Sequence, residues 1–190
     1  MMRWEPGTRD RLREAALELF ADQGFEQTTA AEIASAAGVT ERTFFRWFTD
    51  KREVLFDGQG DYVGRFLDGI AGARTESAPL RLVAAGLDGG ATFFTDKLRP
   101  HSRKRQAVID ENPALQEREL FKNRHLAAAL GEALRGRGVT EPAATLAGET
   151  GATVFQLAFQ QWIRDGETRQ LSEIIHGLLA ELDALHTAPT

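Results

Sequence analysis

Residues 28–51 read TTAAEIASAAGVTERTFFRWFTDK, and this stretch decides the fold. Thr29 and Glu32 have the T-x-x-E spacing of a capping box, which begins a helix because the two side chains satisfy free backbone N–H groups of its first turn. Gly38 is placed to end that helix, and Thr40 is placed to cap a second one after a short turn. The stretch therefore predicts two short helices in immediate succession.

The remaining side chains of this stretch fit a steep crossing of the two helices. Ala34 and Gly38 are small where the two backbones must approach each other closely. The hydrophobic residues at inward-facing positions are Ile33, Ala37, Val39, Phe44 and Trp47. These positions share one register, which is typical of a helix-turn-helix, a motif whose second helix enters the major groove of DNA.

The second helix of the motif carries outward-facing side chains that suit DNA. Arg42 and Arg46 lie four residues apart on one face, and an arginine can donate to the O6 and N7 atoms of guanine. Hydroxyl groups and the free N–H groups of a helix N-terminus suit phosphate oxygens. The exposed ring of Phe45 is costly unless it meets a thymine methyl or a sugar. The predicted DNA-binding residues are Thr29, Thr40, Arg42, Thr43, Phe45, Arg46, Trp47 and Lys51.

An earlier helix is predicted from Thr8, as its N-cap, to about Gln23, with an apolar stripe toward the motif. The cations in and before this helix have two interpretations. They approach the phosphates that flank the recognition site, or they form a solvated charged face. These residues are Arg3, Arg9, Arg11 and Arg13.

Helical periodicity dominates the whole chain, and no stretch alternates convincingly as a strand does. We therefore expect an all-α fold of about nine helices in two domains. A helix-turn-helix DNA-binding domain is predicted over residues 1–56, and a helical effector-binding and dimerisation domain over 57–190. A single connecting helix is expected from residue 52 to about 73, although its glycines disfavour helix.

Composition and charge exclude several classes of protein. Of 190 residues, 42% are hydrophobic and 27% are charged, as in a packed globular protein. The chain has no cysteine, and its four histidines form no HExxH pair. Residues 1–6 lack the apolar stretch typical of a secretory leader, and no run approaches the length of about 18 apolar residues that a membrane helix needs. We expect a cytoplasmic protein without metal, cofactor, catalytic residues or membrane contact. The net charge is −5, so DNA binding must depend on where individual cations lie.

The two helices predicted over residues 140–165 and 171–186 are unusually apolar. One interpretation makes the first of them a central core helix. The other places both helices in a four-helix interface with a second copy of the chain. A helix-turn-helix favours the second interpretation, because a two-fold dimer places two reading helices about one turn of DNA apart on a palindromic operator.

Polar residues on an apolar stripe suggest an effector site in the same part of the chain. Glu119 and Lys122 are either a surface ion pair or polar anchors of a pocket, and the nearby aromatic residues are either core or pocket wall. The predicted ligand-binding residues are Phe94, Glu119, Lys122, Asn123, Phe155, Phe159 and Trp162. His125 is a further candidate, and the cations of residues 103–105 either attract the phosphates of an anionic effector or form a solvated surface.

Residues 8–56 resemble the DNA-binding domain of the TetR family of bacterial transcriptional regulators. The segment that carries the resemblance, residues 16–56, is ALELFADQGFEQTTAAEIASAAGVTERTFFRWFTDKREVLF. The resemblance implies a homodimeric repressor that a small molecule releases from its operator. It also implies DNA contacts from Thr40, Arg42, Thr43, Phe45, Arg46 and Lys51. Two residues depart from the family pattern: Phe45 replaces a usual tyrosine and so loses a hydroxyl contact to phosphate, and Arg42 replaces a frequent glycine.

The C-terminal half is similar to regulators related to the mycofactocin regulator, through the run Val108-Ile109-Asp110-Glu111-Asn112-Pro113-Ala114-Leu115 and the helix behind it. This similarity implies effectors that are hydrophobic or resemble acyl-CoA. Two other classes of function stay open at this point. One is a helical enzyme that uses Glu119, His125 and Asp110, and the other is an interaction protein whose N-terminal domain binds protein instead of DNA.

Overall fold

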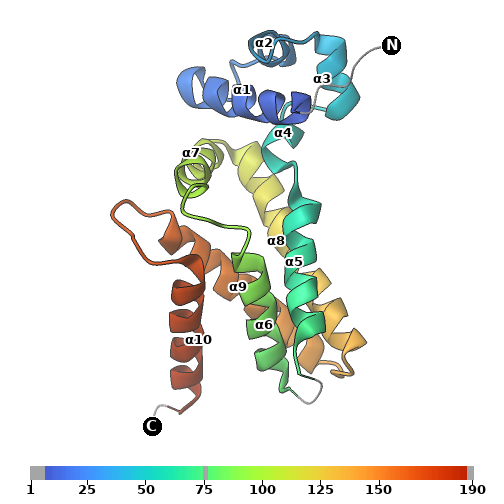
Figure 1. Ribbon diagram of the computed structural model, residues 1–190, viewed down its shortest axis with the longest axis vertical. Coiled ribbons are helices and arrows are strands. Elements are labelled where there is room, and N and C mark those ends of the chain that lie inside the picture. The colour runs from blue at the N-terminus through green and yellow to red at the C-terminus, as the bar shows by residue number, and fades with distance from the viewer. Residues whose placement is uncertain (1–6, 75–76, 188–190) are drawn as a thin grey trace. The chain divides into compact units, whose positions relative to one another are not determined.

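The structure is a computed structural model that describes residues 7–74 and 77–187. Within those ranges it contains ten α-helices and no strand, which confirms the predicted all-α fold (Figure 1). The helices group into two compact units. The head unit comprises the described residues up to Gly58 together with 104–117, and the C-terminal unit comprises the described residues of 59–103 and 118–190.

Helix α1 (Thr8–Gln23) begins at Thr8, one residue earlier than it would if Thr8 were its N-cap. Its N-cap is Gly7, which has a left-handed φ of +105°, and no side chain caps the helix. The prediction that Thr8 is the N-cap is therefore wrong: Thr8 is already helical, because glycine enters the helix from a conformation that other residues rarely adopt. Gly24, at φ +90°, ends the helix as expected.

The caps predicted for α2 (Ala30–Ala36) and α3 (Glu41–Trp47) are confirmed. The Thr29 backbone N–H donates to Glu32 Oε2 at 2.8 Å, and the Glu32 N–H donates to Thr29 Oγ1 at 3.2 Å. Thr40 Oγ1 accepts the N–H of Thr43 at 3.3 Å. Gly38 separates the two helices at φ +70°. The two helices of the motif thus begin at the residues that the sequence predicts.

The core of the head unit is built from large side chains of α1, α2 and α3. Phe20, Ile33 and Phe44 are buried, and the Phe44 ring lies 5.5 Å from that of Phe48. Residues 104–117 complete the core with Val108, Ile109 and Leu115, which are also buried. The helix-turn-helix therefore has a hydrophobic core of its own, which fixes the orientation of α3 within this unit.

The connecting helix that the sequence predicts is broken into α4 (Glu53–Phe56) and α5 (Gln59–Gly72). Gly58 lies between them with φ +82°. Because a residue in that conformation cannot continue a right-handed helix, the described part of the chain has ten helices where about nine were expected. The α4 side chains Val54, Leu55 and Phe56 pack into the head core.

In the C-terminal unit, α5 packs closely against α6 (Pro79–Ala91). A Cβ atom added at Gly69 would lie 2.3 Å from the carbonyl oxygen of Ala85, and one added at Gly89 would lie 2.3 Å from that of Arg65. The glycines that disfavour helix locally are therefore required where the two backbones touch. No helix in the described ranges is both long and apolar enough to span a bilayer.

Helix α9 (Ala143–Trp162) is the centre of the C-terminal unit. One face packs Phe155, Ala158 and Trp162 against α5, α6 and α10 (Leu171–Thr187), all in one hydrophobic cluster. Two further helices, α7 (Arg99–Asp110) and α8 (Pro113–Gly136), each contribute residues to both units. The chain therefore passes between the units three times, twice within a continuous helix.

Candidate nucleic-acid interface and effector site

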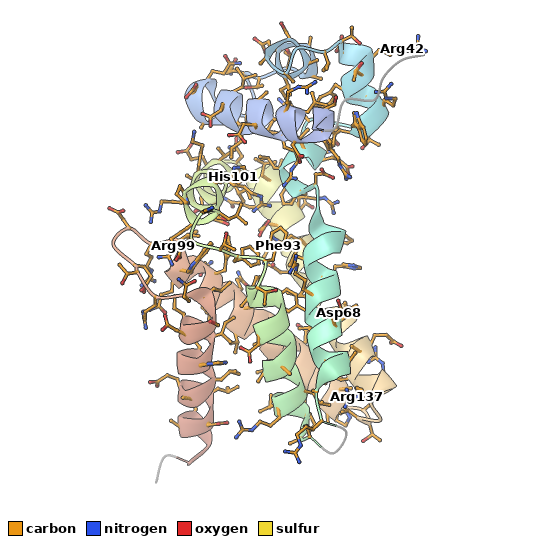
Figure 2. The ribbon with its side chains drawn as sticks, viewed as in Figure 1. Arg42, Asp68, Phe93, Arg99, His101 and Arg137 are labelled. Carbon is orange, nitrogen blue, oxygen red and sulfur yellow. The ribbon has the colours of Figure 1, made fainter. Side chains whose placement is uncertain are left out.

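Helix α3 presents two exposed arginines to the outside of the head unit. Arg42 and Arg46 are exposed and make no hydrogen bond or ion pair with the residues that the structure describes. Figure 2 labels Arg42 on this helix. Between them in sequence, Phe45 is 52% exposed and lies edge-on to the buried Phe44 at 5.3 Å. Two free guanidinium groups and an exposed ring thus share the outer face of a helix whose inner face is fixed in the core.

The hydroxyl groups at the start of α3 lie together. Thr40 Oγ1 and Thr43 Oγ1 are 3.0 Å apart, and Thr40 is exposed while Thr43 is partly buried. Thr40 also supplies the cap of α3, so its position is fixed by the helix that it begins. Thr29 is exposed as well, but its hydroxyl donates to Glu32 at 2.8 Å. Those bonds to Thr29 lower the pKa of Glu32, mainly through the backbone N–H of Thr29.

The Lys51 ammonium group binds backbone carbonyls of its own chain. Lys51 Nζ donates to the oxygens of Phe25 at 2.7 Å, Glu26 at 3.2 Å and Thr28 at 3.0 Å, and it lies 4.4 Å from the centre of the Phe25 ring. Because an ammonium group has three donors, these bonds occupy all of them. The structure therefore shows Lys51 as a clamp on the segment between α1 and α2, a role that the sequence pattern did not predict.

Trp47 and the cations of α1 are engaged within the head unit. Trp47 is partly buried, and the Arg9 guanidinium lies 5.8 Å from the centre of its ring. Arg9 and Arg13 both form ion pairs with Asp57, and Arg11 Nε donates to the carbonyl of Ala37 at 3.3 Å. Arg3 lies outside the described residues. The cations of α1 thus differ from those of α3 in having partners in the chain.

Four predicted effector residues belong to an aromatic cluster in the C-terminal unit. Phe94 is at its centre, with ring centroids 5.5 Å from Phe155, 5.4 Å from Phe159 and 5.9 Å from Trp162. Phe155 and Trp162 are buried in the core, whereas Phe94 and Phe159 are partly buried at its edge. Tyr62 joins the cluster from α5, 6.0 Å from Phe94.

Glu119 and Lys122 form an ion pair beside this cluster, and their side chains are only 15% and 13% exposed. The Lys122 ammonium lies 5.8 Å from the centre of the Tyr62 ring. The pair is therefore neither a freely solvated surface bridge nor an isolated buried charge. Asn123 is partly buried next to it, whereas His125 is exposed. The aromatic cluster around Phe94 and the Glu119–Lys122 ion pair thus lie together in the C-terminal unit.

The three cations of residues 103–105 all have intramolecular partners. Arg103 donates to the carbonyls of Ile163 at 2.7 Å and Arg164 at 2.9 Å, near the C-terminal end of α9. In the head unit, Lys104 pairs with Glu18 and Arg105 donates to a carbonyl of α4. These side chains stabilise the fold, and neither of the two interpretations drawn from the sequence describes them fully.

Sequence reasoning missed Arg99, the first residue of α7. Its side chain is nearly buried, its charge is paired with Asp96 at 2.7 Å, and its guanidinium lies 5.0 Å from the centre of the Trp162 ring. It also donates to the carbonyls of Glu167 and Arg169. Since those partners lie 68 and 70 positions away, no local pattern in the sequence could have indicated this arrangement.

Residues 12–57 match the family of bacterial regulatory proteins described as the tetR family. The HTH-type transcriptional regulator TcmR of Streptomyces glaucescens is 57% identical over 47 residues, which cover 25% of this chain and only 21% of that protein. The proposed mycofactocin biosynthesis transcriptional regulator MftR of Mycobacterium tuberculosis is 28% identical over 172 residues, covering 88% of this chain and 85% of that one.

Among solved structures, FadR of Thermus thermophilus, a TetR-family transcriptional repressor in complex with lauroyl-CoA, is 26% identical with a TM-score of 0.56. The match covers 92% of each chain. The fold and the α2–α3 motif define a helix-turn-helix regulator. Residues 12–57 thus match the tetR family, and the similarities that extend over most of the chain are to transcriptional regulators. These findings confirm the resemblance and the class of function, a transcriptional regulator, predicted from the sequence. The similarity to the mycofactocin regulator is confirmed as well.

Proposed function

We propose that this regulator binds a palindromic operator as a homodimer, represses transcription in the cytoplasm, and is released from DNA by a hydrophobic effector. The observation that carries the proposal is the outer face of α3, where Arg42 and Arg46 are exposed without a partner in the described chain. The other cations of the helix-turn-helix region are engaged, as the carbonyl contacts of Lys51 illustrate. The α3 cations are therefore the ones available to nucleic acid.

The predicted DNA-binding residues on and around α3 each have a role in this proposal. Arg42 and Arg46 donate to guanine O6 and N7, while Thr40 and Thr43 donate to phosphate oxygens at the helix N-terminus. Phe45 contacts a thymine methyl, which offsets its exposure of 52%. Thr29, Trp47 and Lys51 act chiefly by holding α2 and α3 in place, through the capping box, the ring contact and the carbonyl clamp.

A second copy of the chain binds through α9 and α10. Besides the face packed into the core, α9 exposes Leu146 by 64% and Leu157 by 50%, and α10 exposes Leu185 by 80%. Exposed leucines on adjacent helices lose contact with water when a symmetric partner covers them. Helix α9 thus serves both interpretations drawn from the sequence, as a core helix on one face and a dimer helix on the other.

The effector binds in the C-terminal unit beside the aromatic cluster around Phe94. The lauroyl-CoA bound by the Thermus FadR supports effectors of the acyl-CoA class. An effector that binds more tightly to the conformation in which the two α3 helices do not fit the operator lowers the affinity for the operator. The size of that loss is set by the difference in effector affinity between the two conformations. Helix α7 offers a covalent route for this change, because residues 99–103 belong to the C-terminal unit and 104–110 to the head unit.

The experiment measures binding of a duplex selected from a random pool, and of a scrambled duplex, at matched salt. Arg42→Ala should lower affinity for the selected duplex about 10- to 100-fold and affinity for the scrambled duplex much less. Arg124→Ala is the matched control, since Arg124 is an exposed arginine on α8 in the other unit. Lauroyl-CoA should release the wild-type protein from the selected duplex.

Two outcomes would contradict the proposal. Equal losses of affinity on both duplexes for Arg42→Ala would show that this residue does not recognise a base. Phosphate contacts impose a steep salt dependence on binding. Binding that does not weaken with salt would therefore show that the head does not contact phosphates, and would favour a head that binds protein.

A further inference from the structure

Two buried N–H groups in the C-terminal unit have no hydrogen-bond acceptor among the residues that the structure describes. They are Nε of Arg99 and Nε1 of Trp162. Trp162 is completely buried, and the two side chains are in contact, with the guanidinium 5.0 Å from the ring centre. Figure 2 shows Arg99 at the start of α7, which follows the segment that carries Phe93. A buried donor without an acceptor is rare in proteins, and two on touching side chains point to an absent partner.

The remaining bonds of Arg99 fix its orientation. One terminal nitrogen donates to the carbonyl of Glu167, and the other donates to Asp96 Oδ1 and to the carbonyl of Arg169, each at 2.7 Å. Asp96 is tied in turn by Gln170 Nε2, which donates to its other oxygen at 2.6 Å. The guanidinium is therefore held in place largely by the segment between α9 and α10, and Nε is its one nitrogen without an acceptor among the described residues.

The surroundings of the two donors are aromatic. Phe94 and Phe159 lie 5.9 Å from the Trp162 ring, and both are only partly buried. At the Tyr62 side of the same cluster, Lys122 is already neutralised by Glu119. The charged group at that side has its counter-ion, whereas the donors at the Trp162 side lack an acceptor.

We propose that Arg99 and Trp162 form the polar end of the effector site and bind an oxygen acceptor at the end of an apolar chain. This inference rests on the proposed function and names the ligand chemistry of that site. The acceptor is a carboxylate or a thioester carbonyl, since both offer an oxygen to two N–H donors. The apolar chain lies against Phe94 and Phe159.

Calorimetric titration of the full-length protein with three probes of equal chain length tests the proposal. Dodecanoate carries a carboxylate, lauroyl-CoA carries a thioester carbonyl, and dodecylamine carries a cation in place of an acceptor. Trp162→Phe removes the N–H and keeps an aromatic ring. We expect this variant to bind dodecanoate or lauroyl-CoA about 10-fold more weakly than the wild type, and dodecylamine to bind the wild type poorly.

A second pair of variants keeps the test independent of Trp162. Arg99→Lys retains the positive charge and removes Nε, and the same substitution at the exposed Arg124 is its control. In a nitrogen-15 spectrum, the indole resonance that Trp162→Phe removes should move downfield when the wild-type protein binds the probe. A loss confined to lauroyl-CoA would assign the acceptor to the thioester, and a loss with dodecanoate would assign it to a carboxylate.

Unchanged affinity for both oxygen probes in Trp162→Phe, an indole resonance that no probe moves, or dodecylamine binding as tight as dodecanoate would overturn the inference. A structural water would then be the acceptor. These outcomes are distinct from failure of the proposed function. If lauroyl-CoA releases DNA equally from the wild type and from Trp162→Phe, the regulator is as proposed and only the assignment of Arg99 and Trp162 is wrong.

Discussion

The arginines of α3 in the head unit and several arginines of the C-terminal unit are in opposite situations. In the head unit, Arg42 and Arg46 extend from α3 without a partner among the described residues. In the C-terminal unit, Arg137 donates to the carbonyls of Ile70 at 2.6 Å and Ala71 at 2.8 Å, at the end of α5 (Figure 2). Arg99 and Arg103 bind carbonyls near the end of α9 in the same way. These arginines are thus exposed or bound to backbone carbonyls according to whether carbonyls lie within their reach.

The units also differ in how their helices meet. In the head unit, α2 and α3 pack through side chains such as Ile33 and Phe44. In the C-terminal unit, glycines bring the backbones of α5 and α6 into direct contact. Large side chains can adjust when a neighbour changes, whereas a backbone contact leaves no room for an added atom. Substitutions at the glycines should therefore cost more than most substitutions in the head.

The largest effect is expected for Gly69→Ala in α5. The new Cβ would lie 2.3 Å from the carbonyl oxygen of Ala85, so the two helices must separate, and we expect the free energy of unfolding to fall by about 3 kcal/mol. Gly64→Ala is the control in the same helix, because nothing lies within 4 Å of its Cβ position. It should raise stability by about 0.5–1 kcal/mol. Urea denaturation followed by circular dichroism measures both.

Similar effects at the two positions would show that α5 and α6 do not touch through their backbones, and the contrast between the units would lose its main support.

A smaller effect is expected at Lys51, a head cation that binds backbone carbonyls as the arginines of the C-terminal unit do. Lys51→Met removes three hydrogen bonds to the carbonyls of Phe25, Glu26 and Thr28. We expect it to lower the free energy of unfolding by about 2 kcal/mol. Hydrogen bonds from a charged donor are strong, but exposure to water reduces their net contribution to stability. Arg46→Met should change stability by less than about 0.5 kcal/mol, because Arg46 is exposed and lacks a partner in the described chain.

DNA affinity separates the two variants further. Arg46→Met should lose operator binding while remaining fully folded, and Lys51→Met should lose it only in proportion to the unfolding of the head. If Lys51→Met is as stable as the wild type but binds every duplex more weakly, the lysine contacts phosphate directly, as the family resemblance implies.

Interactions within four residues were predictable from the sequence, and interactions across the fold were not. The Thr29–Glu32 capping box and the Thr40 cap depend on residues three apart, so their spacing alone indicates both helices. The partners of Lys51 lie 23 to 26 positions away, and its role could not be predicted. The Gly58 break depends on a left-handed φ that composition alone does not reveal.

The effector site shows the same limit. The sequence predicts the aromatic residues of α9 as effector-binding residues because they lie on an apolar helix. The structure places Phe155 and Trp162 in the core around Phe94. Arg99 follows the same segment as Phe94, but only the fold brings it to the Trp162 ring. A list of apolar and charged residues predicts which side chains gather. It does not predict which donor keeps an unused N–H after the others are bonded.

The smallest effect concerns the acidic partner of another arginine in the C-terminal unit. Hydrogen bonds from the Arg169 side chain, and then from its backbone N–H, lower the pKa of Glu167 from 4.5 to about 2. Because the folded pKa lies below the unfolded one, the bonds stabilise the fold fully above the unfolded pKa of about 4.5, and this contribution disappears as the pH falls toward about 2.

Glu167→Gln removes the titrating group, so stability should fall less steeply with acid than in the wild type. Glu149→Gln, at an exposed position on α9, should leave the slope unchanged. Urea denaturation at a series of acidic pH values measures these slopes, and identical slopes for Glu167→Gln and the wild type would show that Arg169 does not stabilise the fold through the Glu167 carboxylate.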